Sequence, residues 1–224
     1  MALLAATLPH MATAQDKVEA SAGADLVSGY IWRGQDLGGV SIQPALSLAY
    51  KGFSLGAWGS VGINREDTKE LDLTLGYATR GFSISVTDYW FDNGYGYFHY
   101  KAHHTSHVLE AQVGYDFGVA AINWYTNFAG NDGRNKDGDR AYSSYVTLSA
   151  PFRLGGLDWN AEVGAVPWAT DFYNGGTDGF AVCNVSLSAE KAVRITRQFS
   201  LPLFAKATWN PRTEGAYLVV GLSL

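Results

Sequence analysis

Apolar and polar residues alternate along most of this chain with a period of two. In residues 70–77, leucine or tyrosine occupies every second position, and Asp72, Thr74 and Gly76 lie between them. This pattern predicts a β-strand with one apolar and one polar face, of about the 9–11 residues that a tilted strand needs to cross a bilayer. It recurs in twelve segments, residues 18–32, 40–50, 53–63, 70–77, 82–91, 109–115, 120–128, 142–152, 157–165, 183–190, 199–209 and 216–224.

Short turns and long loops connect these segments in alternation. The short turns are flanked by aromatic or large apolar residues, as at residues 50–53 and 77–82, whereas the other connections are longer and rich in Gly, Asp and Asn. Tight turns at one rim and polar loops at the other are typical of a transmembrane β-barrel. The alternation loses its phase at residues 88–91, which predicts a β-bulge or an exit into water.

Alternation alone does not say which face meets lipid, because a soluble barrel would turn the same apolar face inward. Here, however, Ala, Leu, Val and Ile fill the middle of the segments, and aromatic residues lie at both ends. A bilayer imposes this depth profile, whereas a soluble core does not. The aromatic residues of the two expected belts are Tyr30, Trp32, Trp90, Trp124 and Trp209 at one end and Tyr50, Phe53, Tyr77, Phe82, Tyr115, Phe152 and Phe199 at the other.

We therefore predict an all-β fold, a single 12-stranded antiparallel transmembrane β-barrel of the outer-membrane type, over residues 15–224. Lipid offers no partner to backbone N–H and C=O groups, so the sheet must close on itself. Residues 216–224 are accordingly expected to pair with residues 18–32. An even number of strands puts both termini on one side of the membrane, and in an exported barrel with short turns that side is the periplasm of a Gram-negative cell.

Composition narrows the class of protein further. The chain has 224 residues, and no stretch of 18 apolar residues that would form a spanning helix. Its net charge of −5 argues against nucleic acid as a partner. The single cysteine, Cys183, falls on the apolar face of its segment and excludes a disulfide framework. The expected partners are outer-membrane lipid, the barrel-assembly machinery and small polar solutes.

The first residues have the composition of an export signal. Residues 1–14 are apolar and end in Ala12-Thr13-Ala14, an Ala-x-Ala cleavage site before Gln15. We interpret them as the remnant of a signal peptide. The alternative is an apolar N-terminal helix that stays attached to the protein.

Three segments of the chain resemble a known family. The run Ser28-Gly29-Tyr30-Ile31-Trp32-Arg33-Gly34, together with residues 56–60 and 70–77, is similar to the TorF-like family of outer-membrane porins. The similarity is best over residues 18–91 and rests on the rhythm of the strands beyond them. It implies an exported barrel with a channel-like role whose solute is generally unassigned.

The polar faces give the best indication of function. Charged side chains facing lipid would cost about 2–4 kcal/mol at mid-depth, so these faces are expected to line the lumen. The residues expected to line the pore are Asp25, Gln43, Asp72, Glu110, Gln112, Asn123, Glu162 and Lys206. The bulky residues expected to constrict it are Trp58, Tyr125, Tyr145 and Phe204. Because most of the lumen charges are acidic, we expect a channel or porin for passive diffusion of small polar solutes that prefers cations. The alternative is a closed, structural barrel.

Other chemistry is weakly indicated, and we expect neither catalysis nor a cofactor. The cluster His99, His103, His104 and His107 has spacings that could bind zinc, copper or nickel, but a solvated loop explains it as well. The loop of residues 131–139 could hold calcium, although turn chemistry accounts for its Asn, Asp and Gly content. A lipid hydrolase would need His107 beside Ser143 or Ser144, which no spacing in the sequence singles out.

Overall fold

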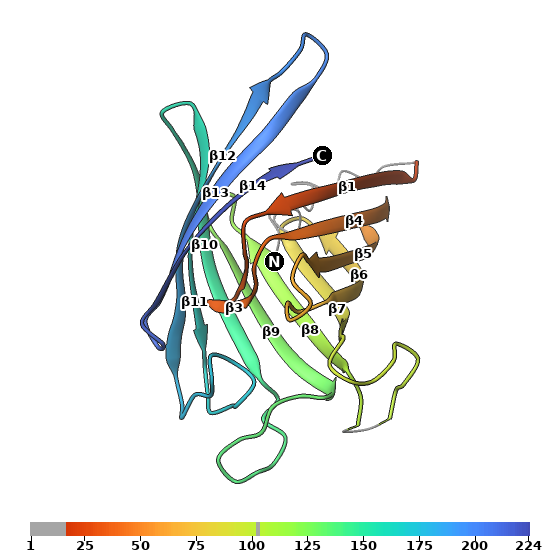
Figure 1. Cartoon of the computed structure of the whole chain (residues 1–224), viewed down its shortest axis with the longest axis vertical. Coiled ribbons are helices and arrows are strands. Elements are labelled where there is room, and N and C mark those ends of the chain that lie inside the picture. Colours follow the sequence, from red (N-terminus) through yellow and green to blue (C-terminus); the bar gives the residue numbers. More distant parts are fainter. Residues whose placement is uncertain (1–16, 102–103) are drawn as a thin grey trace.

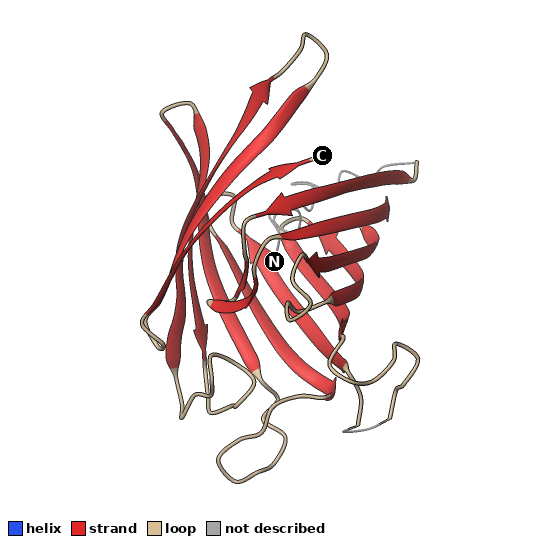
Figure 2. Ribbon diagram, viewed as in Figure 1, coloured by secondary structure: helices blue, strands red, loops and turns tan. Residues whose placement is uncertain are grey.

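The computed structural model describes residues 17–101 and 104–224, so the signal peptide predicted at residues 1–14 lies outside the described part. The described chain is all β, and twelve of its strands form a closed antiparallel barrel (Figures 1 and 2), which confirms the predicted fold class. The barrel strands are β1 (Glu19–Val27), β4 (Ser41–Tyr50), β5 (Phe53–Gly62), β6 (Glu70–Thr79), β7 (Phe82–Phe91), β8 (His107–Asp116), β9 (Ala121–Gly130), β10 (Ser144–Leu154), β11 (Leu157–Val166), β12 (Ala181–Arg194), β13 (Ser200–Asn210) and β14 (Gly215–Ser223). A separate small sheet contains β2 (Tyr30–Trp32) and β3 (Gln35–Gly38). Within these described ranges, no helix has the length and apolar character to cross a membrane.

Strand β1 closes the barrel between β4 and β14. All nine residues of β1 pair with β4. The pairing with β14 is shorter and joins residues 25–27 to residues 221–223. The expected pairing of the first and last segments is therefore confirmed. In Figure 1 the β10–β11 and β12–β13 turns lie at the upper end of the barrel, and the loops that follow β9 and β11 lie at the lower end.

The apolar faces of the strands point outward. Leu46, Leu75 and Leu218 are 61%, 60% and 70% exposed. Exposed aromatic side chains flank the tight turns and the loop ends of the wall. They are Tyr50, Phe53, Phe82, Tyr115, Phe152 and Phe199 near the turns and Trp124 and Trp209 toward the loops. The outer wall thus has an aliphatic band between two aromatic rims, which is the surface that a bilayer covers.

The interior is packed at the loop end and more open at the turn end. On β4, the inward side chains of Ser41 and Gln43 near the loops are buried, whereas Ser47 near the turn is partly exposed. On β7, Tyr89 is buried and Ser85 is partly exposed. Side chains therefore fill the barrel interior near the long loops and leave it accessible to solvent near the tight turns.

The predicted first segment, residues 18–32, consists of two elements. After Val27 the chain enters the barrel, where β2 pairs with β3 in a hairpin (orange in Figure 1). Arg33 and Gly34 form its tip with φ angles of 50° and 78°, the left-handed values that a type I′ turn requires. Tyr30 and Trp32 are each 4% exposed, so their expected place in an outer aromatic belt is wrong. A strand inside the lumen has the same period of two as a strand in the wall, which is why the pattern misled.

The irregularities of the wall also lie elsewhere than expected. Strand β7 stays in register with β6 up to Phe91, so the bulge or exit expected at residues 88–91 is wrong. The register shifts instead between β8 and β9 and between β11 and β12. At the second shift Gly164 and Ala165 pair with Asn184 and Val182, leaving Cys183 unpaired between them. Because of this extra residue, Cys183 is fully buried in the interior and not on the outer face.

Candidate functional site

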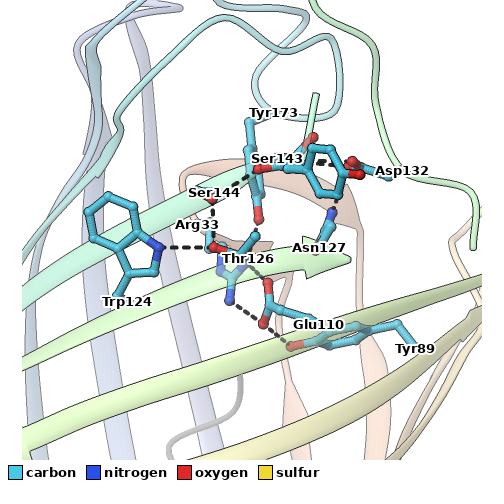
Figure 3. Close-up of polar contacts among 11 residues, drawn as sticks. Arg33, Tyr89, Glu110, Trp124, Thr126, Asn127, Asp132, Ser143, Ser144 and Tyr173 are labelled. Atoms are coloured by element: carbon cyan, nitrogen blue, oxygen red, sulfur yellow. Dashed lines mark hydrogen bonds and ion pairs between the residues drawn. The ribbon is translucent and has the colours of Figure 1, made fainter. Parts of the chain in front are cut away.

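A buried ion pair joins the tip of the β2–β3 hairpin to the barrel wall. Both terminal nitrogens of Arg33 donate to Glu110 on β8, with Nη1–Oε2 and Nη2–Oε1 distances of 2.5 and 2.8 Å. The two side chains are 5% and 2% exposed. Figure 3 shows Arg33 between Tyr173 and Glu110, with the Tyr89 hydroxyl donating to the same carboxylate at 2.9 Å. A bidentate pair shielded from water in this way is a strong and directional contact.

Aromatic rings surround the guanidinium. The Cζ atom of Arg33 lies 4.3, 4.5 and 4.8 Å from the ring centroids of Tyr125, Trp32 and Tyr145. The hydroxyl oxygen of Tyr173, in the β11–β12 loop, accepts a hydrogen bond from Nη1 at 2.5 Å. Burial raises the pKa of Tyr173, while the positive charge of Arg33 acts in the opposite direction. The carboxylate and the ring faces together compensate the desolvation of the Arg33 charge.

Further hydrogen bonds fix the hairpin from the opposite side of the barrel. The backbone N–H of Asn174, in the β11–β12 loop, donates to Gln35 Oε1 at 2.8 Å. The side-chain amide of Asn210, at the end of β13, donates to the Gly34 carbonyl at 2.9 Å and to Asn174 Oδ1 at 2.5 Å. The tip of the hairpin is thus held by side chains from β8, β13 and one loop.

Polar and aromatic contacts also anchor the base of the hairpin. The Tyr30 hydroxyl donates to Glu70 Oε2 on β6 at 2.8 Å. Its ring centroid lies 5.6 Å from that of Trp58 on β5. Asp72, two residues after Glu70 on the same face, pairs across the strands with Trp58. The hairpin therefore contacts the acidic part of the interior at both ends.

Open space lies on two sides of the hairpin. On the loop side, a cavity of about 420 Å³ is lined by residues that include Asp132, Arg134, Asp171, Phe91 and Phe172. The ring centroid of Phe172 lies 6.3 Å from that of Trp32, so the floor of this cavity rests on the hairpin. On the other side lies the partly exposed interior toward the tight turns.

The structure places the residues predicted to line the pore on the inward faces of their strands. They are Asp25, Gln43, Asp72, Glu110, Gln112, Asn123, Glu162 and Lys206. Several hydrogen-bond across strands: Gln112 donates to Asn123 at 2.9 Å, and Asn184 donates to Glu162 at 2.8 Å. Glu110 is the only member of this set that the structure pairs with Arg33, within the residues described.

The bulky residues predicted as a constriction divide into two groups. Trp58, Tyr125 and Tyr145 pack around the hairpin, in one cluster with Tyr30 and Trp32. Phe204 is 7% exposed and belongs to a second cluster with Val27 and Val219, against which Ile31 of the hairpin packs. The bulky side chains thus act as packing partners of the hairpin, a role that the sequence did not indicate.

The histidines lie at the loop end of β7 and β8. His107 is fully buried on the outward face of β8, where Nδ1 lies 2.8 Å from Asp88 Oδ1 and Nε2 lies 2.6 Å from the Tyr97 carbonyl oxygen. His99 and His104 are exposed, and His103 lies outside the described residues. Within the described ranges, no three His, Cys, Asp or Glu side chains are grouped so as to hold a metal ion.

The arrangement that a lipid hydrolase would need is not formed. His107 bonds to Asp88 and Tyr97, as described above. Ser143 Oγ pairs with Thr170 Oγ1 at 2.6 Å. Ser144 Oγ pairs with Thr126 Oγ1 at 2.7 Å (Figure 3). Neither serine is a hydrogen-bond partner of the imidazole, so the structure does not bring together the three residues that this hypothesis required.

Replacing His107 by alanine is expected to loosen the β7–β8 loop without opening the barrel. Loss of the buried imidazole removes contacts worth about 1.5–3 kcal/mol, which raises the population of the open loop roughly 10- to 150-fold. The rate of tryptic cleavage after Lys101 measures this opening, with cleavage after Arg197 in the β12–β13 turn as an internal reference. His99→Ala, at an exposed histidine of the same loop, is the matched control, and equal cleavage of both variants would contradict the prediction.

Comparison with known proteins gives a family but no activity. Among solved structures, the outer membrane phospholipase A from Escherichia coli matches with a TM-score of 0.38 and 14% sequence identity, over 90% of this chain and 86% of that chain. None of the curated proteins matches in sequence. A family model described as a bacterial protein of unknown function (Gcw_chp) matches residues 11–198. This match spans most of the chain, which therefore belongs to the Gcw_chp family of bacterial proteins.

Proposed function

We propose that this protein is a gated outer-membrane channel for passive diffusion of small polar solutes, with cations preferred over anions. The described conformation is then its closed form. The observation that carries the proposal is the β2–β3 hairpin, which lies between a loop-side cavity and a partly exposed, polar interior. The contacts that hold its tip include hydrogen bonds and an ion pair, which water can replace when the hairpin moves.

The outer wall supports the membrane placement. Its aliphatic band and aromatic rims match the depth profile of a bilayer, and its backbone groups are paired by barrel closure. The start of β1 and the end of β14 lie toward the rim of tight turns, which in an exported barrel is the periplasmic rim. The long loops then face the cell exterior. A channel role is also what the resemblance to TorF-like porins implies.

The hairpin is suited to move as a unit. Arg33 adopts a left-handed backbone conformation, which costs a non-glycine residue about 1–2 kcal/mol and which its ion pair offsets. Gly29 precedes the hairpin and Gly39 follows it, so the chain can pivot at both ends. Opening requires separation of Arg33 from Glu110 and of Tyr30 from Glu70, after which each group can be solvated by water in the lumen.

The interior charges support a preference for cations. Inward carboxyl groups outnumber inward basic groups among the described residues. The carboxyl groups include Asp25, Glu70, Asp72, Glu110, Glu162 and Glu190, and the basic groups are Arg33, Lys206 and, next to the tight turns, Arg153 and Arg194. A narrow bore lined by one sign of charge concentrates the opposite ion and repels its own sign.

A planar-bilayer recording tests the proposal. The reconstituted barrel is expected to show brief conductance steps whose reversal potential in a KCl gradient indicates cation preference. Glu162→Gln, at an inward and partly exposed position, is expected to lower the permeability ratio of K⁺ to Cl⁻ about tenfold. One charge some 6 Å from a hydrated ion contributes ~0.7 kcal/mol, with opposite sign for the two ions. Asp137→Asn, in the exposed β9–β10 loop, is the control and should leave the ratio unchanged. A folded preparation with no conductance steps would favour the closed, structural barrel.

A further inference from the structure

The β7–β8 loop folds against the outer wall of the barrel. The structure describes its residues 92–101 and 104–106. The Tyr100 hydroxyl donates to Asp88 Oδ2 at 2.7 Å, and the Tyr100 ring centroid lies 3.8 Å from that of His107. The Tyr97 ring packs 5.9 Å from Trp90. Asp88, Trp90 and His107 lie on the outward faces of β7 and β8, so the loop covers part of the surface that the bilayer would otherwise reach.

The β7–β8 loop supplies hydrogen-bond partners to Asp88 and His107, the two polar residues on the outer face. A carboxylate on a lipid-facing position is costly, and Asp88 accepts hydrogen bonds from Tyr100 and His107 instead of meeting lipid. Desolvation of the Tyr100 hydroxyl against the wall and its hydrogen bond to Asp88 raise the pKa of Tyr100. The loop is therefore held in place by specific contacts with the wall.

The loop leaves several of its aromatic side chains exposed. Phe98 is 92% exposed, Tyr100 is 56% exposed and Tyr95 is 39% exposed. With Trp90 and Tyr97 they form what we term the aromatic patch. Transfer of a phenylalanine side chain from water to an apolar environment is favourable by about 1.5–3 kcal/mol. Contact of Phe98 with an apolar partner would therefore be stabilising.

Basic and titratable groups border the aromatic patch. His99, Lys101 and His104 are exposed beside it. The two nearest carboxylates are engaged, since Asp88 bonds to His107 and Asp92 lies 3.7 Å from Lys69. Aromatic side chains next to exposed basic groups match the boundary at which lipid headgroup phosphates meet acyl chains.

We propose that the aromatic patch docks into the outer leaflet of the membrane, with Phe98 among the acyl chains and Lys101 and His104 at anionic headgroups. The inference rests on the membrane placement proposed above. The patch continues the lipid-facing surface of β7 and β8 without a break, because Trp90 belongs to both. The opposite, inward side of the same strands contacts the hairpin, so a docked loop would fix one side of the closed gate in the membrane.

Spin-label depth measurements test this docking. A nitroxide is attached at Phe98→Cys in a Cys183→Ala background, and its exposure to oxygen and to a water-soluble nickel complex is measured in phospholipid vesicles. Leu75→Cys, on the 60% exposed mid-wall position, marks the bilayer interior, and Asp137→Cys in the β9–β10 loop marks water. The label at residue 98 is expected about 5–10 Å inside the headgroup boundary, between the two references.

The outcomes separate the two proposals. A label at residue 98 that is as water-exposed as the one at residue 137, with residue 75 in lipid, would overturn the docking and leave the membrane placement intact. Water exposure at residue 75 as well would overturn both. In vesicles with equal parts phosphatidylglycerol and phosphatidylcholine, the label is expected deeper than in phosphatidylcholine alone, and Lys101→Gln together with His104→Gln should abolish that difference. Electrophoretic mobility without heating confirms that each variant is folded.

Discussion

Glu110→Ala is expected to open the channel. The substitution leaves the Arg33 guanidinium buried without its carboxylate, and removing one partner of a buried pair costs about 3–5 kcal/mol. The hairpin can recover this free energy by releasing Arg33 into water. The fraction of time that the reconstituted barrel conducts, measured in planar bilayers, should therefore rise strongly, and the barrel should unfold at lower urea concentration.

Two further variants make this prediction specific. Arg153→Ala breaks an exposed ion pair with Asp158 in a tight turn, where the side chains are 76% and 66% exposed, and is expected to change neither conductance nor stability. Arg33→Ala combined with Glu110→Ala removes the buried charge together with its partner. That double variant should be more stable than Glu110→Ala and still conduct more than the wild type. Wild-type conductance in both Glu110 variants would mean that the ion pair does not hold the gate.

Gly34→Ala is expected to displace the hairpin by a steric route. Gly34 has a φ of 78°, and a Cβ atom there would collide with the backbone carbonyl of Cys183. Left-handed strain and overpacking against a rigid backbone together cost about 2–5 kcal/mol. Higher conductance and a lower urea midpoint are expected, because the clashing atom belongs to the backbone of β12 and cannot turn aside as the end of a flexible side chain could.

Gly138→Ala is the matched control for backbone strain. Gly138 has nearly the same φ, 82°, but nothing lies within 4 Å of the position of its Cβ atom. Its cost should be limited to the strain of about 1–2 kcal/mol, with no change in conductance. Equal effects of the two substitutions would show that the packing of Gly34 against Cys183 does not hold the hairpin in place.

The barrel could be predicted from the sequence because lipid imposes a simple rule on every strand. Leu71, Leu73 and Leu75 must face outward, and Asp72 must face inward, so the period of two and the turns suffice to count the strands. The inward direction of Glu110 and Tyr145 follows from the same rule. The rule that apolar side chains face outward and polar ones inward holds for any sheet that separates lipid from a polar interior.

The contents of the lumen could not be predicted in this way. Tyr30 and Trp32 continue the alternation of β1, and only the break at Ser28-Gly29 and the tip Arg33-Gly34 signal a separate hairpin. The contact of Arg33 with Glu110 joins residues 77 apart in the chain, and that with Tyr173 joins residues 140 apart. Such contacts depend on the order of strands around the cylinder and on loop conformations, which no local pattern encodes. Cys183 was misplaced because one inserted residue reverses the faces of a strand.

The short ladder between β1 and β14 bears on how the molecule assembles. The other strand pairs of the wall are neighbours along the chain or are linked through the hairpin, whereas Ser28 and Val220 meet across 192 residues. Contacts between residues so far apart in the chain form late, because the entropy cost of closing a large loop comes before the free energy gained from the hydrogen bonds. The curved sheet therefore completes its circle in a final step, and until then two free edges are available to other strands.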